Sequence, residues 1–314
     1  MPDSQEAVWK ARYDLWSRYV EEVVKTLEAG RAIPIGPSTE RLVPPVVLGA
    51  SAQPTKVAVC SPHPDDEALI GALPLRLRQE SGAQVTNCAI TLGSNVGQRA
   101  RRLRELESAC RVLDFNLVVP RHPSGFDNVN PKTRKGSGDE WAEKVETLGK
   151  IFDREKPDVV FAPHAEDFNT THIGTHYLAA EALAAHLKRS GRGPVLYIET
   201  EFWHELAAPN LMVGVSLDIE TILLMATAEH GGEVERNPYH LRHPGRMIDN
   251  VRLGSETVGG QGAAAVSFPF AELYRVNFMG GEGLIAPKPG GRIVGPAETV
   301  DAAWLTAQFR PGGK

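Results

Sequence analysis

The sequence predicts an α/β fold built on a doubly wound, mostly parallel sheet flanked by helices. Strand-like apolar runs recur at 56–60, 85–91, 116–119, 158–162, 195–199 and 212–218. Helix-like segments separate them at 67–80, 97–113, 139–154, 173–188 and 220–230. Such alternation is typical of Rossmann-like sheets whose parallel strands are joined by right-handed helical crossovers.

The N-terminal segment predicts a long helix outside this alternation. Over residues 6–29, apolar side chains recur at helical spacing, namely Val8, Tyr13, Trp16, Val20, Val23, Val24 and Leu27. We expect this stripe to pack on the sheet or on a second subunit, which makes a homo-oligomer possible; a helix on a membrane surface or against a sugar is the alternative. The chain is therefore divided into a helical extension (1–50) and an α/β domain (51–314).

Three later segments lack a clear period. Residues 120–138 are rich in Pro, Gly, Ser, Asn and Lys, which predicts a long polar loop that acts as a lid or recognises substrate. Residues 235–268 are expected to be irregular, and their glycines lack the spacing of a nucleotide-binding loop. The Gly and Pro clusters over 280–296 predict a loosely packed tail.

Composition agrees with a soluble enzyme and gives no reason to expect a nucleic-acid partner. The chain has 314 residues, 42% of them hydrophobic, and a formal net charge of -5. The basic run Arg99 to Arg104 is interpreted as a solvated helix face.

No apolar stretch is long enough to span a bilayer and no signal peptide is evident, so we expect a cytoplasmic location. Cys60, Cys88 and Cys110 are expected to be buried free thiols of a reducing compartment.

The segment from Val57 to Glu67 carries the chemistry. A buried strand leads into a loop with His63, Asp65 and Asp66, at the strand end where open α/β sheets bind ligands. His63 and Asp66 offer the mixed nitrogen and oxygen donors that suit a hydrolytic zinc ion. Asp65 is then free to accept a proton from water. The alternative is that Asp66 only caps the following helix.

These residues resemble a known family. Pro62-His63-Pro64-Asp65-Asp66-Glu67 is similar to the signature of the PIG-L/LmbE-like zinc-dependent N-deacetylases, and the resemblance implies their LmbE-like fold. Thr91-Leu92-Gly93 followed by Arg102-x-x-Glu105-x-x-x-Ala109 resembles a second family stretch, and Phe270-x-Glu272-x-Tyr274-Arg275 resembles the terminal strand more weakly. Arg102 is expected either to bind the sugar or its phosphate, or to form a structural salt bridge with Glu105.

A further motif of the family matches Asp167-Phe168-Asn169-Thr170-Thr171-His172. The match implies that His172 is the third metal ligand, while a His172/His176 pair one helical turn apart is the competing interpretation. Asn169 stands where many members have a histidine. We therefore expect Asn169 to donate a hydrogen bond to the carbonyl oxygen, with Asp65, His164 or His176 supplying the proton to the leaving amine.

The resemblance implies a zinc-dependent hydrolase that removes an acetyl or short acyl group from an N-acetylglucosamine-type amine. His63, Asp66 and His172 would hold the ion and Asp65 would be the general base. Two alternatives remain at this stage. One is an amide or ester hydrolase with a non-sugar substrate, and the other is a catalytically weak sugar-binding protein, which the loss of a histidine at Asn169 favours.

Overall fold

The computed structural model describes residues 2–37 and 53–312. The chain divides into two compact units, Met1–Ile35 and Gly36–Lys314, and each is considered by itself. The domain boundary expected between residues 50 and 51 lies outside the described residues. No helix in the described ranges is both long and apolar enough to cross a membrane.

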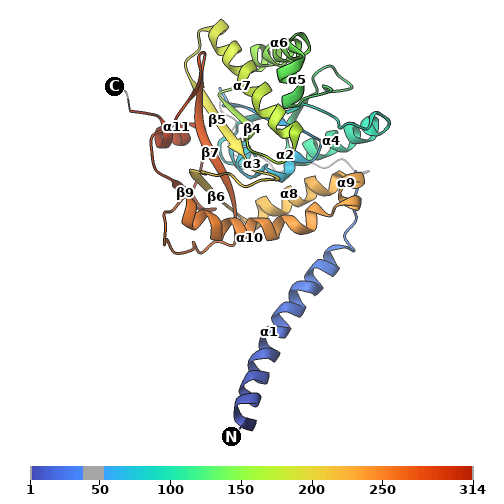
Figure 1. Cartoon of the computed structure of the whole chain (residues 1–314), viewed down its shortest axis with the longest axis vertical. Helices are drawn as coiled ribbons and strands as arrows, with labels where there is room; N and C mark the ends of the chain where they lie inside the picture. Colours follow the sequence, from blue (N-terminus) through green and yellow to red (C-terminus); the bar gives the residue numbers. More distant parts are fainter. Residues whose placement is uncertain (1, 38–52, 313–314) are drawn as a thin grey trace. The chain divides into compact units, whose positions relative to one another are not determined.

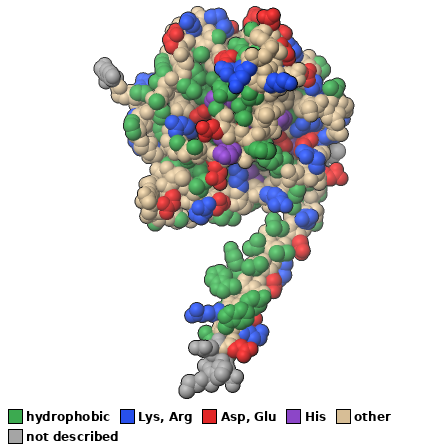
Figure 2. All heavy atoms as spheres, viewed as in Figure 1, with side chains coloured by type: hydrophobic (Ala, Val, Ile, Leu, Met, Phe, Trp, Pro, Cys, Tyr) green, Lys and Arg blue, Asp and Glu red, His purple; other side chains and the backbone are tan. Residues whose placement is uncertain are grey.

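The first unit is the helix α1 (Pro2–Gly30), which contains the predicted helix over 6–29. Its large apolar side chains are exposed, and Figure 2 shows them along the helix. Trp9 and Tyr13 stack with their ring centroids 5.0 Å apart, and Trp16 meets Tyr19 edge to face.

The second unit is built on one mixed sheet (Figure 1). Its main strand order is β3-β2-β1-β4-β5-β7-β6-β9, and β8 pairs with β7. Only β7 and its pairings are antiparallel in this sheet, so the expected mostly parallel arrangement is confirmed. The strands are β1 (Lys56–Ser61), β2 (Gln84–Ala89), β3 (Asn116–Val118), β4 (Val159–Pro163), β5 (Val195–Thr200), β6 (Leu211–Val215), β7 (Phe270–Gly280), β8 (Gly283–Ile285) and β9 (Arg292–Val294).

Helices cover both faces of this sheet, as expected for a doubly wound fold (Figure 1). The second unit's helices are α2 (Asp66–Leu69), α3 (Ala72–Ser81), the 3-10 turn η1 (Val96–Gln98), α4 (Arg99–Leu113), α5 (Pro131–Gly136), α6 (Gly138–Glu155), α7 (Thr170–Ser190), α8 (Leu217–Glu229), α9 (Gly231–Arg236), α10 (Tyr239–Thr257) and α11 (Ala302–Phe309). Helices α6 and α7 pack together on one face, whereas α3, α4 and α8 lie on the other.

The strand β1 shows how the sequence builds these two layers. Val57 and Val59 belong to the core cluster under α3 and α4, while Ala58 and Cys60 belong to the cluster under α6 and α7. Successive strand residues point to opposite faces, and both faces here are covered. A strand of this kind therefore reads as a continuous apolar run. The three cysteines are buried and free, as predicted.

The C-terminal third is more regular than the sequence predicts. Residues 239–257, within the segment expected to be irregular, form the helix α10, which continues through Pro244 near its start. Its apolar face packs on β7 with Met247 and Val251, so tertiary burial outweighs the helix-breaking residue. The prediction of a loosely packed tail over 280–296 is also wrong. It supplies β8 and β9, and Val294 is buried at the sheet edge.

The predicted polar loop over 120–138 is likewise only partly a loop. Phe126 and Val129 are buried in the core cluster beneath α6 and α7, and residues 131–136 form α5, whose N-cap is Asn130. The Pro and Asn residues that suggest a loop instead begin a short helix, because Pro is favoured in the first helical turn and Asn at the N-cap.

Candidate metal centre and cavity

The loop after β1 places the first two candidate ligands. β1 is buried and ends at Ser61, so His63 follows at the carboxyl end of a central strand. The loop is held by Thr91, whose hydroxyl donates to the carbonyl oxygen of Pro62 over 2.8 Å. The backbone N–H of His63 donates to Oδ2 of Asp66 over 2.8 Å. These contacts bring the imidazole and the carboxylate to the same side of the loop.

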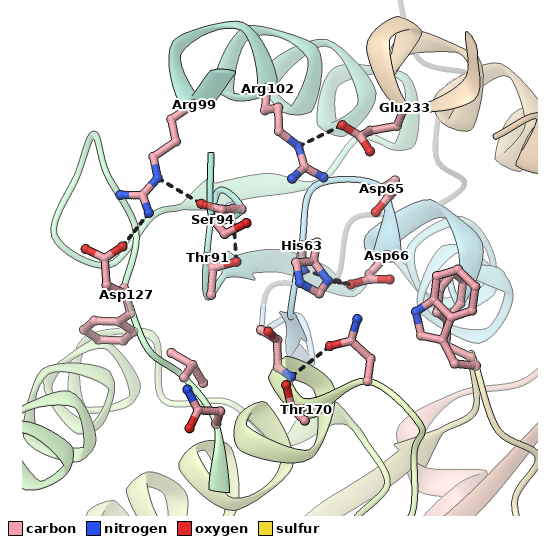
Figure 3. A pocket seen from close by; sticks show the side chains of 18 of the residues that line it. His63, Asp65, Asp66, Thr91, Ser94, Arg99, Arg102, Asp127, Thr170 and Glu233 are labelled. Atoms are coloured by element: carbon pink, nitrogen blue, oxygen red, sulfur yellow. Dashed lines mark hydrogen bonds and ion pairs between the residues drawn. The ribbon is translucent and has the colours of Figure 1, made fainter. Parts of the chain in front are cut away.

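The third candidate ligand comes from α7. His63, Asp66 and His172 each present an atom able to bind a metal, and these atoms lie within 4.8 Å of one another. Oδ2 of Asp66 is 3.4 Å from Nδ1 of His63 and 3.4 Å from Nε2 of His172. Figure 3 shows His63 and Asp66 facing one another beside the cavity. The structure thus brings together the three residues that the motifs indicate.

The surroundings of His172 fit a bound metal. The ring is buried, yet neither Nδ1 nor Nε2 has a hydrogen-bond partner among the described residues. Buried polar atoms are normally paired, so an orphaned Nε2 facing a carboxylate marks a place for a cation. Oδ2 of Asp167 lies 3.6 Å from Nδ1, where carboxylates commonly orient metal-binding histidines. The Phe202 ring stacks against the His172 ring.

Electrostatics at these ligands also favour a cation. Burial by itself would raise the pKa of Asp66, but His172 and His63 outweigh burial and hold that pKa far below its usual range. Burial would lower the pKa of His172, but Asp66 and Asp167 raise it to about 10. In the metal-free protein a proton on His172 therefore balances the carboxylates, and a metal ion would replace that proton.

Asp65 differs from Asp66 in its backbone conformation and in the direction of its pKa shift. It precedes α2 at φ 117°, a conformation that costs an L-residue about 1–3 kcal/mol and is found mainly at functional sites. Its side chain makes no capping hydrogen bond, and Asp66 lies inside α2, so neither residue serves as a side-chain N-cap. Burial, reinforced by Asp66, raises the pKa of Asp65 well above its usual value, and His230 and Arg102 offset this only in part.

His63, Asp65 and Asp66 line a cavity of about 510 Å³, whereas His172 is not part of its wall. Its wall includes His63, Asp65 and Asp66 from the first loop, and Asn169 to Thr171 from the start of α7. Further along are Phe126 to Asn130, and then Phe202, Trp203, Glu233, Arg236 and Tyr239. Several segments distant in sequence therefore meet around a single opening large enough for a sugar.

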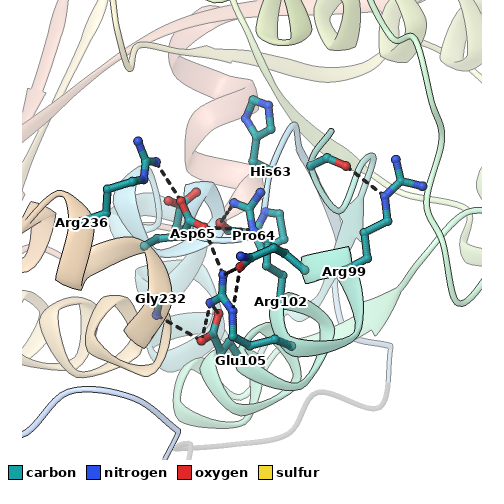
Figure 4. A network of polar contacts seen from close by, with 12 residues as sticks. His63, Pro64, Asp65, Arg99, Arg102, Glu105, Gly232 and Arg236 are labelled. Atoms are coloured by element: carbon teal, nitrogen blue, oxygen red, sulfur yellow. Dashed lines mark hydrogen bonds and ion pairs between the residues drawn. The ribbon is translucent and has the colours of Figure 1, made fainter. Parts of the chain in front are cut away.

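Arg102 is one of the cavity residues. Its Nη2 donates to the carbonyl oxygen of Pro64 over 3.2 Å, and its Nε lies 3.4 Å from Oε1 of Glu233 (Figures 3 and 4). The alternative salt bridge with Glu105 is wrong, because Glu105 pairs with Arg101 over 2.5 Å. Gly93, at φ +87°, lets the guanidinium lie against the backbone, since a Cβ there would come within 2.2 Å of Arg102 Nη1.

The basic run on α4 is not simply a solvated face. Arg99 and Arg102 are largely buried and line the cavity, while Arg104 is exposed. Arg99 donates to the carbonyl oxygen of Gly93 over 3.0 Å and pairs with Asp127 (Figure 3). The prediction of a solvated face is therefore wrong for Arg99 and Arg102, because one turn of α4 faces the loop that follows β2.

Asn169 caps α7. Its Oδ1 accepts a hydrogen bond from the backbone N–H of Thr171 over 2.8 Å, so the amide oxygen is occupied. The –NH2 group is then the part of the side chain left to face the cavity. This geometry allows donation to a substrate oxygen.

His164 and His176 are not brought to the cavity wall. Nε2 of His164 lies 2.9 Å from the carbonyl oxygen of His204, and its Nδ1 accepts from the backbone N–H of Glu166 over 3.3 Å. Nδ1 of His176 lies 2.9 Å from the carbonyl oxygen of Pro163, and burial lowers the His176 pKa. In the described part of the chain, the group of residues able to hold a metal contains His172 but not His176, so the alternative His172/His176 ligand pair is not formed.

Sequence reasoning missed the cavity residues of 201–239. Trp203 follows β5, and Arg236 and Tyr239 come from α9 and α10. No local motif marks them. The aromatic pair Phe202-Trp203 directly after a buried strand was the one available signal, because strand ends in such sheets face the ligand crevice.

The fold and site define a doubly wound α/β protein with a histidine and carboxylate metal-type site at the carboxyl ends of its strands. Residues 58–183 match the PIG-L family, described as GlcNAc-PI de-N-acetylase. This match confirms the resemblance that the motifs indicate. No protein with a curated description matches the chain in sequence.

Solved structures share the fold. N,N'-diacetylchitobiose deacetylase from Pyrococcus horikoshii is 18% identical at a TM-score of 0.52, covering 74% of this chain and 86% of its own. A zinc-inhibited form of teicoplanin deacetylase is 16% identical at 0.50, covering 71% and 97%. The 4-carboxy-2-hydroxymuconate hydratase of Pseudomonas putida is 16% identical at 0.50, covering 71% and 96%. Because a hydratase shares the fold, function must be argued from the site.

Proposed function

We propose that this chain is a zinc-dependent hydrolase that removes an acetyl or short acyl group from the amine of an N-acetylglucosamine-type substrate. One observation carries the proposal. His63, Asp66 and His172 present their metal-binding atoms to one another, and the imidazole nitrogens of His172 have no hydrogen-bond partner in the described part of the chain. The buried carboxyl of Asp65 follows His63 in the same loop but is not one of these three groups. The mixed nitrogen and oxygen donor set suits zinc, and the PIG-L match supports the acetamide substrate.

The ion and the base would have separate tasks. A divalent cation held by His63, Asp66 and His172 would polarise the amide carbonyl and make a nearby water more acidic. Asp65 accepts a proton from the attacking water while the new carbon–oxygen bond forms. Its raised pKa makes it a stronger base than an exposed aspartate, which suits proton transfer near neutral pH.

The remaining residues act on the carbonyl oxygen and on the leaving nitrogen. The –NH2 group of Asn169 is free to donate to the carbonyl oxygen as negative charge develops there. When the carbon–nitrogen bond breaks, Asp65 passes its proton to the departing amine, giving a carboxylic acid and a free amino group. Both ring nitrogens of His164 and Nδ1 of His176 contact backbone groups, which supports Asp65 as the source of this proton.

The cavity wall is suited to a polar ring with an apolar face. Trp203 and Tyr239 meet edge to face with centroids 6.1 Å apart, and Phe202 lies beside both. Aromatic side chains contact the apolar faces of sugars, while Arg102 and Arg236 offer donors to hydroxyl or anionic groups.

The proposal is tested with purified protein reconstituted with zinc and N,N'-diacetylchitobiose as the substrate. We expect acetate and free amine to appear in equal amounts, and a chelator to stop the reaction. Calorimetric binding of the sugar without product would instead identify the catalytically weak binding protein. If metal-loaded protein neither binds nor hydrolyses this sugar or N-acetylglucosamine, the sugar-deacetylase assignment is wrong.

A further inference from the structure

Glu67 and His230 form a buried pair next to the proposed base. Oε1 of Glu67 lies 2.7 Å from Nε2 of His230, and both side chains are 0% exposed. The two residues come from different elements, since Glu67 lies in α2 and His230 lies between α8 and α9. Neither lines the cavity, so the pair is not a direct contact for substrate.

The pair reaches Asp65 through the backbone. The other carboxylate oxygen of Glu67, Oε2, accepts the backbone N–H of Asp65 over 3.1 Å. Both Glu67 oxygens are thus engaged, one with His230 and one with Asp65. A buried glutamate is held in a single orientation by two such contacts, and loss of either partner would leave a buried polar group unsatisfied.

This contact matters because Asp65 is held in a conformation that L-residues rarely adopt. At φ 117° its N–H turns toward Glu67, and no side-chain cap at the start of α2 stabilises that turn. A strained residue persists only when its surroundings over-determine it. The Glu67 carboxylate is the contact that satisfies the Asp65 N–H in this geometry.

His230 also connects this turn to α9, which contributes Glu233 and Arg236 to the cavity wall. Its backbone carbonyl accepts from the N–H groups of Glu233 and Val234, over 2.9 and 3.0 Å, at the start of α9. In α9, Glu233 pairs with Arg102, and the N–H of Gly232 donates to Glu105 over 3.1 Å. Figure 4 shows Gly232 and Glu105 in the polar network around Asp65 and Arg102. One buried residue therefore joins the base-bearing loop to α9.

We propose that Glu67 and His230 are positioning residues that hold Asp65 in its strained backbone conformation and so aim its carboxylate at the reacting water. This rests on the proposed function, in which Asp65 is the base. His230 acts through the hydrogen bond to Glu67. A group that can still donate from the same place should therefore preserve its role, and an isosteric apolar group should abolish it.

The experiment compares His230→Leu with His230→Gln in the zinc-loaded full chain. With N,N'-diacetylchitobiose, we expect kcat of His230→Leu to fall by about ten- to a hundredfold while KM changes by less than about threefold, because only the aim of the base is lost. The glutamine amide can donate to Glu67, so His230→Gln should keep kcat within about threefold of wild type. Zinc content should be unchanged in both.

His186→Leu is the matched control. His186 is also buried and pairs with a carboxylate, Asp153, over 2.6 Å, but it lies on α7 outside the cavity wall. We expect it to lower the unfolding temperature without changing kcat. A wild-type kcat in folded His230→Leu, or an equal loss in His230→Gln and His230→Leu, would overturn the proposal.

A second measurement needs no substrate and separates this proposal from the function. Hydrogen exchange of the peptide over residues 61–69 reports the Asp65 amide, which the pair protects. Protection of the Asp65 amide should be lost in His230→Leu and kept in Glu67→Gln. If His230→Leu does not fold, Glu67→Met takes its place and should also lose protection. Unchanged exchange in these apolar variants would overturn the positioning role even if the wild type is an active deacetylase. If the wild type is inactive but the apolar variants lose protection of the Asp65 amide as expected, only the proposed function is contradicted.

Discussion

Oδ2 of Asp66 lies 3.4 Å from Nε2 of His172, and neither nitrogen of that imidazole has a hydrogen-bond partner within residues 2–37 and 53–312. Asp66 lies in α2, which follows β1, and His172 lies in α7, which follows β4. The strands β1 and β4 are neighbours in the sheet. A buried imidazole facing a carboxylate without a hydrogen bond is poised to share a cation.

The first prediction concerns metal content. His63→Ala and His172→Ala should each lose most bound zinc, because removing one of three protein ligands leaves too few donors. Metal is measured by elemental analysis of protein purified with zinc present. His176→Ala serves as the control and should retain about one ion per chain, since its Nδ1 contacts the Pro163 carbonyl. Full zinc in His172→Ala would remove this residue from the ligand set.

The second prediction separates metal binding from chemistry. Asp65→Asn keeps the size of the side chain but removes the base, so turnover should fall by about a hundred- to ten-thousandfold. Zinc content should stay at the wild-type level, because Asp65 is outside the cluster of ligand atoms. The measurement pairs steady-state kinetics with metal analysis. An Asp65→Asn protein that keeps most of its turnover would show that the base lies elsewhere.

The third prediction concerns the source of the leaving-group proton. His164→Ala and His176→Ala, made separately, should each reduce kcat by about tenfold or less, because neither side chain lines the cavity. The loss should be far smaller than that of Asp65→Asn. Folding and zinc content are checked in the same samples. A deep loss in one histidine variant with zinc intact would identify that histidine as the acid.

The fourth prediction concerns protons released when metal binds. The pKa of His172 is raised to about 10, mainly by Asp66 against the effect of burial, so the metal-free imidazole is protonated at neutral pH. Metal needs the neutral ring and must displace about one proton, so affinity should rise about tenfold per pH unit below about 10 from this group. Calorimetry in buffers of different ionisation enthalpy measures the proton count.

Asp167→Asn is the control for that measurement. It removes one of the two carboxylates that raise the His172 pKa, so fewer protons should be released at the same pH. Binding without proton release in the wild-type protein would show that His172 is already neutral.

The fifth prediction concerns substrate binding. Arg102→Ala should raise KM about tenfold or more with a smaller effect on kcat, because the guanidinium lines the cavity but is neither a proposed metal ligand nor the proposed base. Arg104→Ala is the matched control on the same helix, where the side chain is exposed. Initial-rate kinetics distinguish the two. Equal KM values in both variants would indicate that Arg102 has only a structural role.

The sequence by itself determined the layered fold and the core of the candidate site. Alternating strands and helices predict the sheet, because burial on both faces makes each central strand a continuous apolar run. His63, Asp65 and Asp66 are adjacent in one strand-to-helix loop, so their proximity is a local property. A motif resemblance predicts His172 as the third ligand, and the structure brings His172 next to His63 and Asp66.

Only the tertiary structure decided which other side chains reach the site. Arg102 rather than Arg104 lines the cavity, and Arg236 arrives from α9, because these placements depend on how helices pack across the sheet. The same holds for α10, whose helix is stabilised by burial against β7 despite Pro244. His230 approaches Glu67 from a distant part of the chain, and no local pattern encodes such a contact. Local periodicity reports which face of an element is buried, but not which partner buries it.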